Sequence, residues 1–154
     1  MIYIKDFVDA VGIFVNSGLF ADELMHGFIN ILFAGIFYYK CRNIKMSALV
    51  LFVTYIIDID HLVDYFLFYG VNFSFSTFIS LDYFGITQRA VVPFHAWEWV
   101  VLLVMYSTQT KKYKLLLRAI ATGMFAHLIW DSITVGTPIF YIILYRISQS
   151  FIVI

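Results

Sequence analysis

Charged side chains are scarce in this sequence of 154 residues, and it contains a single cysteine. Lys, Arg, Asp and Glu together make up 13% of the chain, whereas an average soluble domain has about 25%. A chain this short needs polar residues over most of its surface to fold in water, so an ordinary soluble globular protein is excluded. The single Cys41 excludes an intrachain disulfide framework and a cysteine-based structural zinc site. Ten basic residues balance ten acidic ones, which argues against a nucleic-acid partner recognised by bulk electrostatics.

Long apolar stretches take the place of the missing charge, since 62% of the residues are hydrophobic. A helix needs about 20 mostly apolar residues to cross a bilayer. The sequence therefore predicts an all-α integral membrane protein with four transmembrane helices in a compact bundle. The four predicted spans are Leu24–Tyr39, Met46–Tyr69, Val91–Ser107 and Leu115–Val135.

The two ends of the chain are expected to differ from this core. We expect one membrane domain over residues 1–154, with its four-helix core over 22–135. Residues 1–21 have apolar side chains at helical spacing, which predicts an amphipathic helix that lies in the membrane interface. The tail, 139–154, is apolar but carries Arg146 and three further polar residues, so it is either a fifth span or an interfacial segment.

The basic residues indicate an orientation. They are concentrated in the connections after the first and third predicted spans, at Lys40, Arg42, Lys45, Lys111, Lys112, Lys114 and Arg118. Cytoplasmic loops collect Lys and Arg, so both connections are expected to face the cytoplasm. The connection over 70–90 then faces outward.

Each predicted span carries one histidine in its outer half, and each histidine has an acidic residue one helical turn away. The four histidines are His26, His61, His95 and His127. Their neighbours at a spacing of three or four are Asp22 and Glu23, Asp58 and Asp64, Glu98, and Asp131. Because residues three or four apart share a helix face, each helix should direct a histidine and an acid the same way.

The number of acids within the spans predicts a metal centre. An acid at mid-membrane costs about 2.5–3.5 kcal/mol, and five such acids together approach or exceed the net stability of a typical protein. Divalent cations would neutralise several carboxylates at once, and His with carboxylate is a ligand set for zinc, manganese or iron. We expect two ions, most simply zinc, with ligands from His26, Asp58, Asp60, His61, His95, Glu98, His127 and Asp131.

Three motifs carry a resemblance to a known family. They are His26-Gly27, Asp58-Ile59-Asp60-His61 and the run His127-Leu128-Ile129-Trp130-Asp131-Ser132. They resemble the membrane-bound metal-dependent hydrolases, which include inner-membrane hydrolases of the LexA-regulated type, and distantly the zinc-dependent phospholipase C. The family usually has a basic residue and a glycine shortly before a His-Ser pair, where this chain reads Phe94-His95-Ala96-Trp97-Glu98. The resemblance implies hydrolytic chemistry in a prokaryotic cytoplasmic membrane. The distribution of basic residues predicts that the metal site faces the extracytoplasmic side.

The leading hypothesis is a metal-dependent hydrolase that cleaves a phosphoester or ester of a membrane lipid or lipid-like substrate. In it, Glu98 bridges the metals or takes a proton from the attacking water. Asp64 is a further catalytic or orienting acid. Arg89 holds a phosphate oxygen.

Alternative functions use the same residues. A carboxylate-x-x-His spacing occurs at Glu23–His26 and at Asp58–His61, and this spacing is used in di-iron carboxylate bundles, so a membrane oxidoreductase is the first alternative. Intramembrane His and Asp residues also occur in transporters of protons or metal ions. The last alternative is a non-catalytic subunit whose buried acids bind a helix of a partner protein.

Overall fold

The computed structural model describes residues 11–12 and 18–152, and its regular structure is helical throughout. No strand is present among these residues, and the one β-bridge joins Arg89 to Ile152. The predicted all-α class is therefore confirmed. The predicted interfacial helix over 1–21 lies mostly outside the described residues, and residues 18–21 already belong to the first long helix.

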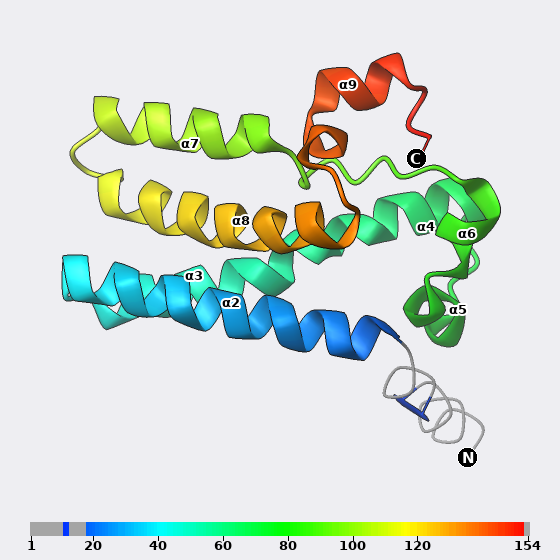
Figure 1. Cartoon of the computed structure of the whole chain (residues 1–154), viewed down its shortest axis with the longest axis horizontal. Helices are drawn as coiled ribbons and strands as arrows, with labels where there is room; N and C mark the ends of the chain where they lie inside the picture. Colours follow the sequence, from blue (N-terminus) through cyan, green and yellow to red (C-terminus); the bar gives the residue numbers. More distant parts are fainter. Residues whose placement is uncertain (1–10, 13–17, 153–154) are drawn as a thin grey trace.

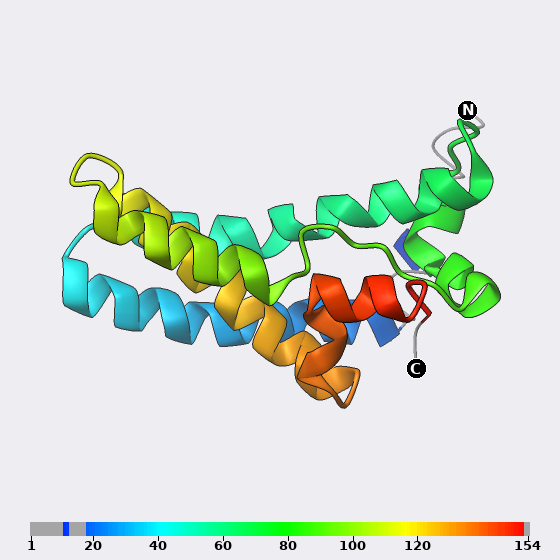
Figure 2. The same ribbon diagram turned by 90° about the horizontal axis from the view of Figure 1, so that it is seen from above.

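Four helices run alongside one another (Figure 1). They are α2 (Gly18–Cys41), α3 (Ile44–Ile57), α7 (Trp97–Gln109) and α8 (Lys114–Thr134). Helix α8 packs against each of the other three. The turn between α2 and α3 and the turn between α7 and α8 lie at the same end of the bundle (Figure 2). We call this end, which carries the seven basic residues named above, the basic end.

Small residues allow α8 to approach its neighbours closely. Ala119 and Ala126 are fully buried on α8. A Cβ atom at Gly123 would lie 2.6 Å from the backbone oxygen of Val50 and 2.9 Å from the Cβ atom of Val53. Small residues at helix contacts are typical of membrane bundles, where close backbone approach supplies much of the attraction.

The second predicted span is interrupted by one tighter turn. Helix α3 ends at Ile57, a 3₁₀ turn η1 covers Asp58–Asp60, and helix α4 covers His61–Tyr69. Within 11–12 and 18–152, two helical segments are long and apolar enough to cross a membrane: this run, Ile44–Tyr69, and Phe20–Cys41. This finding does not extend to the four or five predicted spans.

The third predicted span is wrong in its first part. Residues 88–96 form no helix, and α7 begins only at Trp97. Pro93 lacks a backbone N–H, and the residue before a proline is biased away from helix, so this stretch favours an extended path. We call residues 88–96 the extended segment. Helix α7 has 13 residues and a length of about 20 Å, which is short for a bilayer core of about 30 Å.

Two short helices, α5 (Phe75–Ser80) and α6 (Asp82–Thr87), close the end of the bundle opposite the basic end (Figure 1). They pack around Tyr65, which is 1% exposed. Its hydroxyl donates to the backbone oxygen of Asn72 at 3.1 Å and accepts from the N–H of Ser74 at 2.9 Å. The connection over 70–90 is thus anchored to α4.

The tail does not form a fifth span. It consists of a 3₁₀ turn η2 (Pro138–Tyr141) and a six-residue helix α9 (Ile143–Ser148), which is far too short to cross a bilayer. Its far end lies beside the extended segment, where the N–H of Ala90 donates to the oxygen of Phe151 at 2.9 Å. The alternative of an interfacial segment stays a prediction.

Candidate metal centre

Seven predicted ligands come together in the half of the bundle away from the basic end. They arrive from α2, from η1 and the start of α4, from the extended segment and from α8, and are His26, Asp58, Asp60, His61, His95, His127 and Asp131. Most of these side chains are buried, and those of Asp58 and His61 are 19% and 22% exposed. Their sequence separations show that the centre forms only when the bundle folds.

Four donor atoms form the middle of this cluster. The Nε2 atoms of His95 and His127 lie 3.0 Å apart. Asp58 Oδ1 is 3.2 Å from the first and 3.4 Å from the second. Asp131 Oδ2 is 3.3 Å from His127 Nε2 and 3.7 Å from His95 Nε2. In a tetrahedral zinc site with bonds of about 2.0–2.2 Å, neighbouring donors are about 3.3–3.6 Å apart. The printed distances are close to this spacing, and the donors form two groups of possible ligands that share His127: Asp58 with His95, and Asp131 with His26. We call the four atoms the central donor set.

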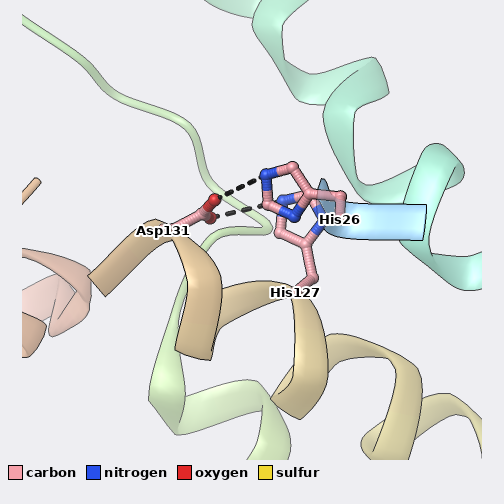
Figure 3. A group of neighbouring side chains, drawn as sticks. All are labelled: His26, His127 and Asp131. Atoms are coloured by element: carbon pink, nitrogen blue, oxygen red, sulfur yellow. Dashed lines mark ion pairs between the residues drawn. The ribbon is translucent and has the colours of Figure 1, made fainter. Parts of the chain in front are cut away.

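One further histidine flanks each central carboxylate. His26 Nε2 lies 3.0 Å from Asp131 Oδ1, and its ring stacks on His127 at 3.9 Å (Figure 3). On the other side, His61 Nε2 lies 3.4 Å from Asp58 Oδ1. Each of these two carboxylates therefore faces histidines on more than one side, as a carboxylate shared between two ions would.

Asp60 lies behind His95. Its two oxygens are 3.0 and 3.1 Å from His95 Nδ1, and Oδ2 also accepts the backbone N–H of Phe94 at 2.6 Å. A carboxylate on the far nitrogen of a histidine fixes the ring and directs its other nitrogen toward a metal. The sequence predicted Asp60 as a direct ligand. The structure places it where it orients His95, and with His61 and His95 it also forms a second group of possible ligands.

Buried polar atoms without partners surround the central donor set. Among the described residues, those with no hydrogen-bond partner include Asp58 Oδ2, His26 Nδ1, His61 Nδ1 and His127 Nδ1. If His95 donates its Nδ1–H to Asp60, its Nε2 carries a lone pair that faces His127. Lone pairs and carboxylate oxygens facing one another in a buried place need a shared cation or proton. A divalent cation therefore fits this donor set.

A cavity of about 260 Å³ gives access to the cluster. Asp22 and Glu23 line it on one side and Tyr141 on another. Asp22 accepts a hydrogen bond from the indole N–H of Trp130 and lies 3.6 Å from His26 Nε2. Burial raises the pKa of the Tyr141 phenol, with the charge of Asp131 a further cause, so Tyr141 stays a hydrogen-bond donor.

Two buried charges hold the extended segment in place. Asp64 accepts the N–H groups of Val91 and Val92 at 2.6 and 2.9 Å. Arg146, from α9, donates to the carbonyls of both residues and to that of His95. Buried backbone groups outside regular structure need such partners. Asp64 and Arg146 are therefore positioning residues for His95, and the predicted catalytic role of Asp64 is not supported by its position.

The other two predicted catalytic residues also lie away from the cluster. Glu98 accepts the N–H of Ile143 at 2.8 Å and does not line the cavity. The exposed Arg89 lines a separate cavity beside Asp64. The spacing of His95 and Glu98 failed as a guide because His95 precedes α7, so the two residues share no helix face.

Sequence reasoning paired Asp22 and Glu23 with His26 by spacing but did not count them among the ligands or catalytic residues. It missed the roles of Tyr141 and Arg146, since they come from a tail whose path no local pattern predicts. No family model matches the sequence, and no curated protein and no solved structure matches it either.

Proposed function

We propose that the chain is a membrane-embedded, metal-dependent hydrolase whose centre cleaves a phosphoester or ester of a lipid-like substrate. The observation that carries this proposal is the central donor set, two histidines and two carboxylates with five mutual distances of 3.0–3.7 Å. It stands at the wall of a cavity, so substrate can reach it.

In this proposal α2, α3 with α4, α7 and α8 all lie within the membrane. Large apolar side chains are exposed along all of them, as for Phe28 on α2, Phe52 on α3, Met105 on α7 and Phe125 on α8. Exposed apolar surface of this extent fits contact with lipid. The basic end faces the cytoplasm and the metal centre the extracytoplasmic side. The resemblance to membrane-bound hydrolases supports a prokaryotic cytoplasmic membrane.

The bound ions, zinc first with manganese or iron as alternatives, would lower the pKa of a water molecule and polarise the ester. Asp58 and Asp131 supply the negative charge that holds them, and Asp60 orients His95. Glu23 takes the role predicted for Glu98: it lines the cavity, and its Oε2 has no hydrogen-bond partner among the described residues. It can accept the proton of the attacking water.

A lipid-like substrate is favoured by a second, apolar cavity of about 380 Å³. It shares Glu23, Asp58 and His61 with the first cavity and continues between Tyr55 and Phe78. An ester bond at the metal centre would thus have room for an apolar chain beside it.

The test is metal analysis and hydrolysis by detergent-purified protein. Wild type is expected to hold up to two ions per chain and to cleave phospholipids or lipid phosphates, with activity lost on chelation and restored by metal. Asp58→Asn and His127→Ala should lose both metal and activity. Asp82→Asn is the matched control, since Asp82 is an exposed acid on α6 outside the cavity. Correctly folded wild type without metal, supplied with each ion, would refute the proposal.

The alternatives predict other results of the same experiment. Stoichiometric iron with a visible absorption band would favour the di-iron oxidoreductase. Metal-dependent flux across proteoliposomes, without hydrolysis, would favour transport.

A further inference from the structure

A groove lies at the basic end of the bundle, outside the metal centre. Helices α2 and α7 form its walls and α8 its floor, and its volume is about 710 Å³. We call it the α2–α7 groove. Its apolar lining includes Phe33, Phe37, Val100, Val104, Ala121 and Phe125. Its size is within the range of about 300–1,000 Å³ that is typical of small-molecule sites.

Two exposed cations, Lys40 of α2 and Arg118 of α8, also line the groove. No acidic residue can neutralise them nearby in the sequence, because residues 24–57 and 99–130 contain no Asp or Glu. The same two stretches contain seven basic residues. In the part of the chain that the structure describes, Arg118 makes one long contact, from Nε to the hydroxyl of Ser107 at 3.5 Å, and its other guanidinium donors are open to a ligand.

We propose that the α2–α7 groove binds one anionic membrane phospholipid. Its phosphate lies at Lys40 and Arg118, and an acyl chain runs along the apolar walls toward Phe33. Basic pockets between membrane helices on the cytoplasmic side are a recurring site for anionic headgroups. The two cations favour an anionic lipid over a neutral one, and the apolar walls favour a lipid over a free phosphate ion. This site is independent of the proposed catalysis.

The test is native mass spectrometry of the full chain in detergent, titrated with phosphatidylglycerol and with phosphatidylcholine. Wild type should bind one phosphatidylglycerol at least tenfold more tightly than phosphatidylcholine. Lys40→Ala with Arg118→Ala should weaken that binding on the order of 30-fold, from about 1 kcal/mol for each cation. Lys111→Ala with Lys112→Ala removes the same charge from the same end outside the groove, and should change binding less than threefold.

A third variant blocks the groove and leaves both cations in place. Thr122 is half-buried in the lining, so Thr122→Trp fills the space that the acyl chain would occupy. It should weaken phosphatidylglycerol binding at least tenfold. Circular dichroism and metal content should stay those of wild type, which separates this result from a failure of the metal centre.

Four outcomes would overturn the proposal. Equal losses in the two charge variants would mean unspecific attraction to the basic end. Equal binding of the two lipids would remove the role of charge. Displacement by glycerol 3-phosphate at equal concentration would make the site a headgroup site without an acyl chain. A dimer that Thr122→Trp dissociates would make a second copy the occupant.

Discussion

Replacement of Arg146 tests how the metal centre is built. Its side chain is 1% exposed, and its guanidinium donates to the carbonyls of Val91, Val92 and His95. Arg146→Gln keeps a polar side chain of similar length but removes the charge and the forked donors. The extended segment then loses three hydrogen bonds on one side, while Asp64 still holds the two N–H groups on the other.

The expected cost follows from burial. Removal of one member of a buried, hydrogen-bonded set of charges costs about 3–5 kcal/mol. A shift of His95 out of the central donor set should also lower metal affinity, by about 10–100-fold as for other residues that orient a ligand. Arg146→Lys should fall between wild type and Arg146→Gln, because an ammonium keeps the charge but cannot bond three carbonyls in one plane.

Thermal unfolding in detergent and competition with a metal chelator measure these two effects. Arg89→Gln is the matched control, since Arg89 belongs to the same segment but is exposed. It should change stability by less than about 0.5 kcal/mol. If Arg146→Gln has the same unfolding temperature and the same metal affinity as Arg89→Gln, the extended segment is held by something other than Arg146, and this explanation is wrong.

Three further predictions concern the centre and the bundle. Asp58→Asn should lower metal affinity more than 100-fold, because Asp58 faces three histidine Nε2 atoms, whereas Asp60→Asn should lower it only about 10–100-fold, because Asp60 orients one ring. Equilibrium dialysis measures both affinities, and equal losses would contradict these roles. Gly123→Ala should destabilise the protein by about 1–3 kcal/mol in thermal unfolding, since the new Cβ atom would lie 2.6 Å from the backbone oxygen of Val50. Gly35→Ala is the control, because a Cβ atom there would have no described atom within 4 Å. Zinc at a hundred times its Kd should stabilise wild type by about 2.7 kcal/mol, an increment that chelation removes and that should be absent in His127→Ala.

Much of the metal centre follows from the sequence because helical spacing is local. His127 and Asp131 are four residues apart within α8, and their side chains meet at 3.3 Å. His61 and Asp58 keep their contact across η1, because a 3₁₀ turn also brings residues three apart together. His26, His61 and His127 therefore lie in one cluster, as their helical spacing from acidic residues predicted.

The parts that failed depend on contacts distant in the sequence. His95 belongs to a segment without helical or strand periodicity, whose path is set by Asp60, Asp64 and Arg146. Arg146 follows His95 by 51 residues, and no spacing rule links them. The predicted partner Glu98 was wrong for the same reason, since helical spacing was applied to a residue outside the helix.

The charges of the centre bear on how many ions it holds. The carboxylates of Asp58, Asp60 and Asp131 in the cluster, with that of Asp64 behind it, oppose one buried cation, Arg146. Four acids and one arginine carry a net charge of −3 when the histidines are neutral, and the carboxylates of Asp22 and Glu23 at the cavity wall make it −5. Uncompensated buried charge is costly. One divalent ion would reduce the net charge to −3 and a second ion to −1, so two ions come closer to neutrality than one. A measured ratio of two ions per chain would agree with this balance, whereas a ratio of one would require that histidines carry the missing positive charge.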